Sequence, residues 1–216
     1  MAPAGRPRAF DLDAAEETAM QLFWDRGYEG VSLADLKDSM GISSASFYAA
    51  FGSKEGLFER VVRRYAAVTN HIMRIISDES LPAREAVALY LHESVDAQTR
   101  TDNPKGCLIA LNGTLGGAGV PEPARDAIRF RRDADRRQIH ACVARAAARG
   151  DLRPDVDLEG WTAALHGFTL GVAVQARDGV SADELHRAAD VLLMAWDATT
   201  TPTVAGAAGH KDPAAS

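Results

Sequence analysis

The fold of this chain is decided by residues 32–51, SLADLKDSMGISSASFYAAF. Ser32 is a favourable N-cap, and Asp35 stands three residues later, where the reciprocal partner of a capping box belongs. Gly41 falls where a first helix must end, because glycine adopts a left-handed backbone without steric cost. Ser43 then caps a second helix. The stretch therefore predicts a helix-turn-helix whose second helix reads DNA.

Apolar residues give each of these short helices one buried face. Leu33, Leu36 and Met40 recur at helical spacing in the first helix, and Phe47 and Phe51 lie four residues apart in the second. The other side of the second helix carries small serine and alanine residues, which leaves it free to approach a duplex.

The same stretch resembles a known family. In the frame GYEGVSLADLKDSMGISSASFYAAFGSKEGLF, the pattern Phe-Tyr-x-x-Phe-x-x-Lys-Glu follows the turn glycine. Residues 8–62 resemble the DNA-binding domain of the tetracycline-repressor (TetR) family of bacterial regulators. One departure is Lys37, because the family often has a small residue at that helix crossing. The positions that carry the resemblance are Tyr28, Ser32, Leu36, Gly41, Ser43, Phe47, Tyr48, Phe51 and Lys54.

Length and composition fit a soluble regulator. The 216 residues allow one large or two small domains, and 46% hydrophobic with 25% charged residues is ordinary for a globular protein. No apolar run is long enough to span a bilayer, and the start, MAPAGRPRAF, lacks a signal-peptide core. We expect a cytoplasmic, nucleoid-associated protein with no membrane partner. The two cysteines form no C-x-x-C pair, which argues against a disulfide scaffold or zinc ribbon.

Net charge gives no support for nucleic-acid binding. The chain has a formal charge of −6, and up to Tyr65 it carries ten acidic residues against eight basic ones. DNA binding must therefore depend on where individual cations lie, since phosphate neutralisation acts within a Debye length of about 10 Å. We expect non-specific binding to be weak.

Signatures of catalysis are missing from the sequence. It contains no H-E-x-x-H, G-x-S-x-G, Walker or dinucleotide motif, so we expect no enzyme activity, no cofactor and no metal site. His92 and Asp96 stand one helical turn apart and could bind a metal, but two ligands are poor evidence for a metal site and an exposed ion pair explains them.

The rest of the chain is predicted to be all-α. A helix runs from Asp11 or Asp13 to Arg26, and a long amphipathic helix follows Ser53 through Val68 to Ile76. Further helices begin at Pro82, at Asn103-Pro104 and at Pro121 or Pro123, and the second of these carries Cys107, Leu108, Leu111 and Leu115. Two more helices cover 158–177 and 181–198, and the last one opens with a capping box of Ser181 and Glu184. The predicted domains are a flexible basic arm (1–10), a helix-turn-helix domain (11–52), a helical ligand-binding and dimerisation domain (53–198) and a disordered tail (199–216).

Small and apolar residues mark the last two helices. Gly160, Gly167 and Gly171 accompany Trp161, Ala164, Leu165, Phe168 and Val172, and Leu185, Val191, Leu192, Leu193 and Trp196 follow. The resemblance implies that these helices form an intermolecular four-helix bundle in a homodimer; an interior helix pair within one subunit is the alternative. A homodimer would bind a pseudo-palindromic double-stranded DNA operator.

Several residues are candidates for DNA contact. Arg6 and Arg8 flank a proline, which suits a narrow minor groove, although a solvated tail is equally consistent. The serines of the second helix would read bases and Ala45 could meet a thymine methyl, while Tyr48, resembling the family tyrosine that contacts a phosphate, could instead be an aromatic plug. Lys54 and the free N–H groups of Ser32 should bind phosphates. The full set is Arg6, Arg8, Ser32, Ser43, Ser44, Ala45, Ser46, Tyr48 and Lys54.

The second half is expected to sense an effector. If Asn103 caps and Pro104 opens a helix, Cys107 lies in its first turn, where the helix dipole and Lys105 would stabilise a thiolate. Pro-Lys-Gly-Cys-Leu also resembles a subset of the family that responds to thiol-reactive compounds, whereas a small buried hydrophobe is the alternative. The candidate effector-binding residues are Cys107, Asn112, His71, His140 and His166.

We therefore expect a homodimeric repressor that a small-molecule or thiol-reactive effector releases from its operator. The alternatives are an effector-independent regulator or activator of the same fold, or a helical adaptor that does not bind DNA.

Overall fold

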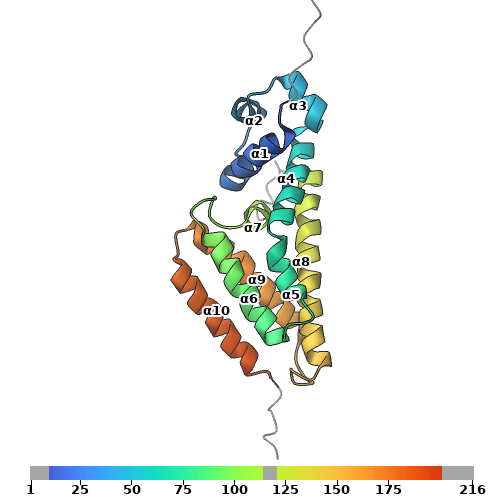
Figure 1. The fold of residues 1–216 in the computed structure, drawn as a ribbon, viewed down its shortest axis with the longest axis vertical. Coiled ribbons are helices and arrows are strands. Elements are labelled where there is room, and N and C mark those ends of the chain that lie inside the picture. The colour runs from blue at the N-terminus through green and yellow to red at the C-terminus, as the bar shows by residue number, and fades with distance from the viewer. Residues whose placement is uncertain (1–9, 114–120, 201–216) are drawn as a thin grey trace, which may run out of the picture.

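The computed structural model describes residues 10–113 and 121–200, which form an elongated all-α molecule (Figure 1). Within these ranges no strand occurs, and the one β-type contact is an isolated bridge between Leu152 and Thr200. The predicted fold class is confirmed. The helices are α1 (Leu12–Arg26), α2 (Leu33–Met40), α3 (Ser44–Phe51), α4 (Lys54–Val68), α5 (Asn70–Ser77), α6 (Ala83–Thr99), α7 (Leu108–Gly113), α8 (Glu122–Ala148), α9 (Leu158–Arg177) and α10 (Ala182–Asp197).

The predicted helix-turn-helix is present with its caps. Ser32 and Asp35 form a reciprocal capping box at the start of α2, and Gly41 ends α2 in the left-handed conformation at φ 64° and ψ 34°. Ser43 caps α3 by accepting a hydrogen bond from the backbone N–H of Ser46. Local residue choice therefore fixes both ends of the turn, as the sequence predicts.

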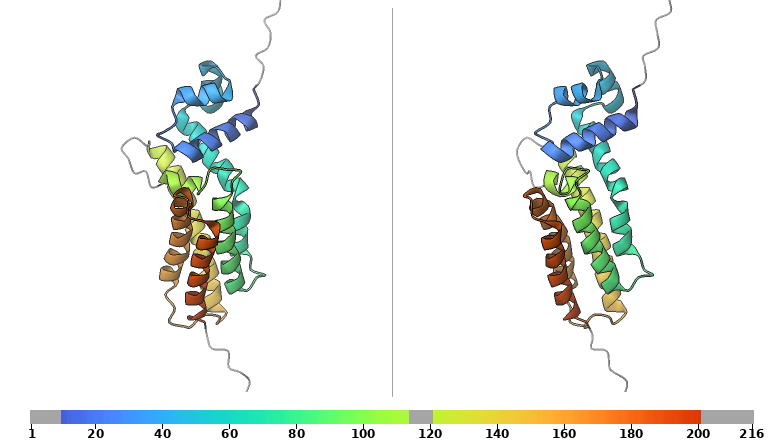
Figure 2. Two further views of the ribbon diagram at one scale, coloured as in Figure 1. Left: turned by 90° about the vertical axis from the view of Figure 1, so that its left-hand side faces the viewer. Right: turned by 60° about the vertical axis from the view of Figure 1, so that its left-hand side comes forward.

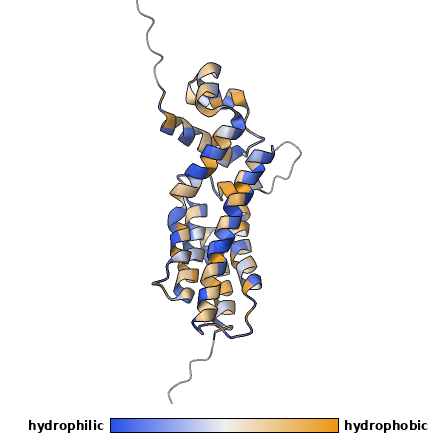
Figure 3. Cartoon of the chain, turned by 90° about the vertical axis from the view of Figure 1, so that its right-hand side faces the viewer, coloured by the Kyte–Doolittle hydropathy of each residue, from blue (hydrophilic) through white to orange (hydrophobic). Residues whose placement is uncertain are grey.

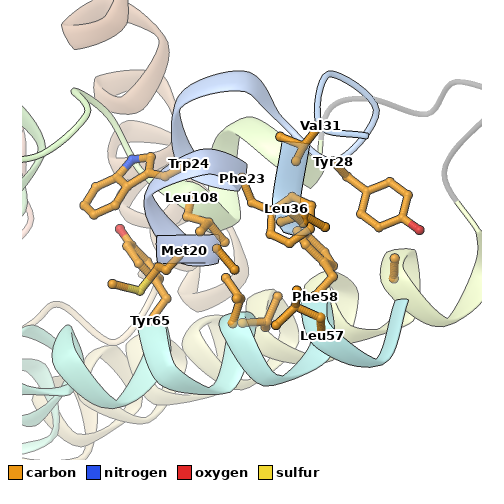
Figure 4. Packing of buried hydrophobic residues seen from close by; sticks show 14 of the residues in the cluster. Met20, Phe23, Trp24, Tyr28, Val31, Leu36, Leu57, Phe58, Tyr65 and Leu108 are labelled. Carbon is orange, nitrogen blue, oxygen red and sulfur yellow. The ribbon is translucent and has the colours of Figure 1, made fainter. Parts of the chain in front are cut away.

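An aromatic cluster joins α1, α2, α3 and α4 into one core (Figure 4). The ring of Phe58 packs edge-on against Phe23 and Tyr28, with both centroid separations at 5.1 Å. Edge-to-face pairs of this kind add to the free energy gained from burying the rings. The cluster extends past Phe51 along α4 to Tyr65 and includes Leu108 of α7, so it links the N-terminal helices to the second half.

The long helix predicted after Ser53 is broken in two. Thr69 separates α4 from α5 with φ −91° and ψ 2°, and its hydroxyl donates a hydrogen bond of 2.8 Å to the carbonyl oxygen of Tyr65. The predicted buried face is therefore wrong at Val68, which is 59% exposed, whereas Ile72 and Ile76 are buried in a second core.

The second core lies among α5, α6, α8, α9 and α10, where α10 runs alongside α6 (Figure 2). The colouring in Figure 3 shows hydrophilic and hydrophobic residues alternating along these helices, as expected where one side of each faces the core. Pro82 precedes α6, Pro121 precedes α8 and Ser181 caps α10, as predicted.

The helix predicted from Asn103-Pro104 begins later. Its first residue is Leu108, and the preceding Gly106 has φ 87° and donates a backbone hydrogen bond of 2.7 Å to the carbonyl oxygen of Gln98. Asn103 accepts a hydrogen bond from Gln21 of α1 instead of capping a helix. Cys107 therefore precedes the first turn rather than lying inside it.

Some predicted features fall outside the described residues. These are Arg6 and Arg8 of the basic arm, Leu115 with the glycine-rich segment that follows it, and residues 201–216 of the predicted tail. Thr199, also assigned to the tail, instead accepts a backbone hydrogen bond from Arg153. None of the helices in the described ranges is long and apolar enough to cross a membrane.

Candidate DNA-reading surface and effector cavity

Helix α3 presents its polar side outward at one end of the molecule (Figure 1). Phe47 and Phe51 are buried and anchor the helix to the core, whereas Ser44 and Ala45 are exposed. Tyr48 is 52% exposed, which excludes the alternative that it is a buried aromatic plug. Tyr48 belongs to α3 itself, and an exposed tyrosine hydroxyl can donate a hydrogen bond to a phosphate.

Ser43 and Ser46, two of the serines predicted to contact bases, are hydrogen-bonded to each other. The Ser43 hydroxyl accepts a hydrogen bond of 3.1 Å from the Ser46 backbone N–H and donates one of 3.0 Å to Ser46 Oγ. Ser43 therefore serves chiefly as the cap of α3, and Ser46 keeps its own hydroxyl hydrogen for an outside acceptor.

Lys37 lies beside the start of α3. Its Nζ donates a hydrogen bond of 2.9 Å to Ser44 Oγ. The sequence reasoning treated Lys37 only as a departure at the helix crossing, so it missed this cation on the reading surface. Lys37 and Ser44 are seven residues apart, and the short connection Gly41–Ser43 brings the end of α2 close to the start of α3.

The expectation that Ser32 offers a free N–H to phosphate is wrong. The Ser32 backbone N–H donates to Asp35 Oδ2 at 2.7 Å, and this bond helps to hold the pKa of Asp35 below its ordinary value, after the bond from the Ser32 hydroxyl. The carboxylate would also repel a phosphate at this point.

Lys54 is positioned by aromatic and acidic neighbours. Its Nζ lies 4.1 Å from the ring centroid of Tyr28, and the Tyr28 hydroxyl donates a hydrogen bond of 2.9 Å to Glu55. Partial burial lowers the pKa of Lys54, while Glu55 and two other acidic residues oppose this shift. The cation is thus fixed at the N-terminus of α4, next to the end of α3.

The outer surface of α9 and α10 is apolar and small. Of the residues predicted for it, five are buried within the subunit, where α9 packs mainly on α8 and α10 mainly on α6: Leu165, Val172, Leu185, Leu193 and Trp196. The remaining surface is exposed, with Gly160, Ala164 and Gly167 on α9, and with Val191 at 66% and Met194 at 70% on α10.

A cavity of about 100 Å³ lies between the two cores. Trp24 of α1, Thr69 at the break after α4, Gln98 of α6 and Asp135 of α8 contribute to its wall. Two of the five predicted effector-binding residues, Cys107 and His166, also line it. An occupant would thus touch the DNA-binding helices and the second half together.

Cys107 is not activated as the sequence predicted. Burial raises the pKa of its thiol, although a hydrogen bond with the Tyr65 hydroxyl opposes the shift. The predicted thiolate required the first turn of a helix, whereas Cys107 precedes α7, a helix of six residues. Lys105 is exposed on the loop before it.

His166 and Asp135 give the cavity two titratable groups. Burial, followed by the nearby Arg132 and Arg136, lowers the pKa of His166, so its ring is neutral at neutral pH. Burial raises the pKa of Asp135 to about 6, against the opposing effect of Arg131, whose Nη2 lies 3.0 Å from Asp135 Oδ1.

The other predicted effector residues do not line this cavity. Asn112 is buried, but its side-chain oxygen accepts from the Tyr28 backbone N–H at 2.8 Å and its nitrogen donates to the carbonyls of Phe23 and Leu108. His140 pairs with Glu159 at 3.2 Å on the surface.

His71 is exposed beside a second, neighbouring pocket, which Glu93 and Asp96 also line. Asn112 therefore holds helices together, and neither His71 nor His140 lines the cavity between the two cores.

His92 and Asp96 are not paired with each other but are bridged by His186 of α10. The two imidazoles share a hydrogen bond of 2.8 Å between their Nδ1 atoms, and His186 Nε2 lies 2.9 Å from Asp96. His92 Nε2 lies 3.3 Å from Asp190. Because Nδ1 bonds to Nδ1, only one of these atoms carries a hydrogen, and the cluster ties α6 to α10.

Two family models match the chain. The one described as "Bacterial regulatory proteins, tetR family" covers residues 17–61, and the one described as "Tetracyclin repressor-like, C-terminal domain" covers residues 83–192. The first range contains α2 and α3 with their caps, and the second contains most of the helices around the cavity.

Several transcriptional regulators are similar to this chain over about half of its length or more. The HTH-type transcriptional repressor ComR of Escherichia coli strain K12 is 32% identical over 194 residues, which are 89% of this chain and 91% of that protein. The HTH-type transcriptional repressor BdcR of the same strain is 35% identical over 105 residues, 49% of this chain and 53% of that protein. A solved cysteine mutant of the TetR family transcriptional regulator CifR, complexed with 26-base-pair double-strand operator DNA, is 41% identical with a TM-score of 0.82, covering 88% of this chain and 100% of that chain.

Proposed function

The chain belongs to the TetR family of bacterial transcriptional regulators, and from this premise we propose that it is a homodimeric repressor that a small ligand releases from its operator. The observation that carries the proposal is the exposed polar side of α3, held outward by the buried Phe47 and Phe51. ComR and BdcR are named as repressors, and CifR is known with operator DNA, which supports the same role here.

DNA contact would use two kinds of residue. Ser44, Ala45 and Ser46 of α3 face base edges in the major groove, and Tyr48 with Lys54 bonds the phosphates on either side. Because one reading helix covers few base pairs, a second copy at a site about 34 Å away is needed for specificity.

The second copy would dock on α9 and α10. Gly160, Ala164 and Gly167 let a partner helix approach closely, and exposed Val191 and Met194 would be removed from water. Four helices, two from each subunit, would then pack about a two-fold axis.

Release would begin in the cavity between the two cores. An engineered cavity of about 150 Å³ holds benzene, so a cavity of about 100 Å³ suits a small ligand unless its wall moves. The occupant contacts Trp24 of α1 and Thr69 at the end of α4, so it would favour a different spacing of the two α3 helices. A ligand shifts this equilibrium only by its difference in affinity for the two states.

The test combines DNA selection with a ligand screen. Wild-type protein is offered a randomised duplex library and the sequence upstream of its own gene, and sedimentation then gives the number of subunits per duplex. Two subunits on a pseudo-palindrome are expected.

If the protein selects no duplex from the library, the alternative of a helical adaptor that does not bind DNA is favoured. Thermal-shift screening of small metabolites, with and without operator, should find compounds that stabilise free protein and release DNA. DNA binding that no compound changes would leave the effector-independent regulator.

A further inference from the structure

The reading helix itself holds no side chain that identifies a base strongly. Its sequence, SASFYAAF, contains no Arg, Lys, Asn or Gln. A serine hydroxyl can both donate and accept, so by itself it discriminates weakly between base edges. Any stronger preference must come from a neighbouring element.

Lys37 of α2 supplies the missing group. Its Nζ reaches Ser44 Oγ at 2.9 Å, at the first residue of α3 and on the exposed side of the helix. The ammonium has three hydrogens and the bond to Ser44 uses one, so two remain for an outside acceptor.

The same bond changes what Ser44 can offer. Its oxygen accepts from Lys37, which occupies one lone pair and polarises the O–H bond, so the hydroxyl is favoured as a donor toward the DNA. Ser43 and Ser46 are joined by their own hydrogen bonds, and Ser44 is the serine that accepts from Lys37. The surface therefore carries two hydrogen-bond donors side by side.

Guanine is the base whose major-groove edge matches two adjacent donors. It presents two acceptors, N7 and O6, whereas adenine pairs an acceptor with a donor, thymine pairs an acceptor with a methyl group, and cytosine presents a donor. We propose that Lys37 and Ser44 act as one unit that reads a guanine in each half-site. The inference rests on the proposed DNA-binding function and adds to it the base that α2 and α3 recognise together.

The test measures base preference rather than affinity alone. Sites are selected from a randomised duplex library by wild type, and binding is then measured for every single-base change in one half-site. The variants are Lys37→Met, Ser44→Ala and the double variant, with Lys105→Met, an exposed lysine of the second half, as the matched control. Thermal unfolding confirms that each variant is folded.

Wild type should prefer guanine at one position by roughly 5- to 150-fold, and Lys37→Met should abolish most of that preference while leaving the other positions unchanged. Ser44→Ala should reduce the preference at the same position, and the double variant should lose little more. Lys37→Arg should retain it, because arginine also offers two donors to guanine.

An atom-level control uses 7-deazaguanine, which removes the N7 acceptor. Placing it at the preferred position should lower the DNA affinity of wild type at least fivefold and leave the DNA affinity of Lys37→Met nearly unchanged. A Lys37→Met protein that binds all sequences more weakly, with its preferences intact and a reduced salt dependence, would show a phosphate contact and overturn this inference alone. Failure of wild type to select any duplex would overturn the proposed function together with it.

Discussion

Arg177 in the last turn of α9 donates a hydrogen bond of 2.7 Å from Nη2 to the backbone carbonyl of Trp24 in the last turn of α1. Its Nη1 donates a second bond of 3.0 Å to the carbonyl of Asp25. The proposed dimerisation helix is thereby tied directly to the first helix of the DNA-binding region. This guanidinium group therefore adds to the contacts with α4 and α7 that position α1.

Arg177→Met should weaken this tie. Loss of two charge-assisted hydrogen bonds is expected to lower the free energy of unfolding by about 1–3 kcal/mol, because two helix-end carbonyls lose their partner. Urea unfolding measures the change. Arg129→Met, which removes an exposed ion pair with Asp126, should cost less than about 1 kcal/mol. Equal effects for the two variants would argue against a structural role for Arg177.

Asn112→Leu should be more damaging than its position in a short helix suggests. The change leaves the Tyr28 N–H without its buried partner and removes one of the two hydrogen bonds to the Phe23 carbonyl, at an expected cost of about 1–3 kcal/mol. Asn103→Leu removes a part-buried side-chain bond to Gln21 and serves as the control, with an expected loss of about 1 kcal/mol. If the two variants unfold at the same denaturant concentration, Asn112 does not have the structural role assigned to it.

Tyr48→Phe and Lys54→Ala should weaken binding to every duplex alike. Each removes a proposed phosphate contact, and such a contact carries no sequence information, so about 5- to 10-fold lower affinity with unchanged base preference is expected. Fluorescence anisotropy at two salt concentrations should also show a shallower salt dependence for Lys54→Ala. If Lys54→Ala binds DNA as tightly as wild type at moderate salt, Lys54 does not contact a phosphate.

Acidity should affect stability through Asp135. Burial raises its pKa from 3.8 to about 6, so the folded state holds this proton more tightly than the unfolded state does. Its contribution to stability is complete below its ordinary pKa of 3.8 and is lost as the pH rises through about 6.

Over that range the free energy of unfolding of wild type should fall relative to Asp135→Asn by up to about 3 kcal/mol. Asp133→Asn, an exposed residue on the same helix, should follow the wild-type profile. Parallel curves for wild type and Asp135→Asn would contradict the shift.

Val191→Glu should separate the proposed dimer. A charge placed in the apolar surface of α9 and α10 would have to be buried without a partner. Sedimentation at micromolar concentration is expected to find single subunits, with DNA affinity reduced at least tenfold. Phe130→Glu changes a side chain that is 74% exposed on α8 and should leave the assembly intact.

Local signals predicted most of the fold. Ser32, Gly41, Ser43 and Ser181 are caps or helix stops whose role depends only on nearby backbone, and each lies where the sequence placed it. The break at Thr69 was missed because apolar residues continue at a spacing of four on both sides of it.

Residues whose partners are distant in sequence could not be placed from the sequence. The start of α7 depends on Gly106, whose N–H bonds to Gln98 of another helix. Asn112 looked like a ligand-binding residue because nothing nearby reveals that its partners are Tyr28 and Phe23. Lys37 was assigned no role since its partner lies across the turn.

The interruption at Thr69 is a potential hinge between α4 and α5. Helix α4 belongs to the aromatic core and α5 to the second core, so the two bodies meet at a residue that already lacks regular helical geometry. A rotation of α4 about this point need not unwind an intact helix or displace α5. Thr69 also lines the cavity, so a bound molecule would contact the hinge directly. A small expansion of the cavity at Thr69 would rotate α4 and thereby displace α3 by a larger distance.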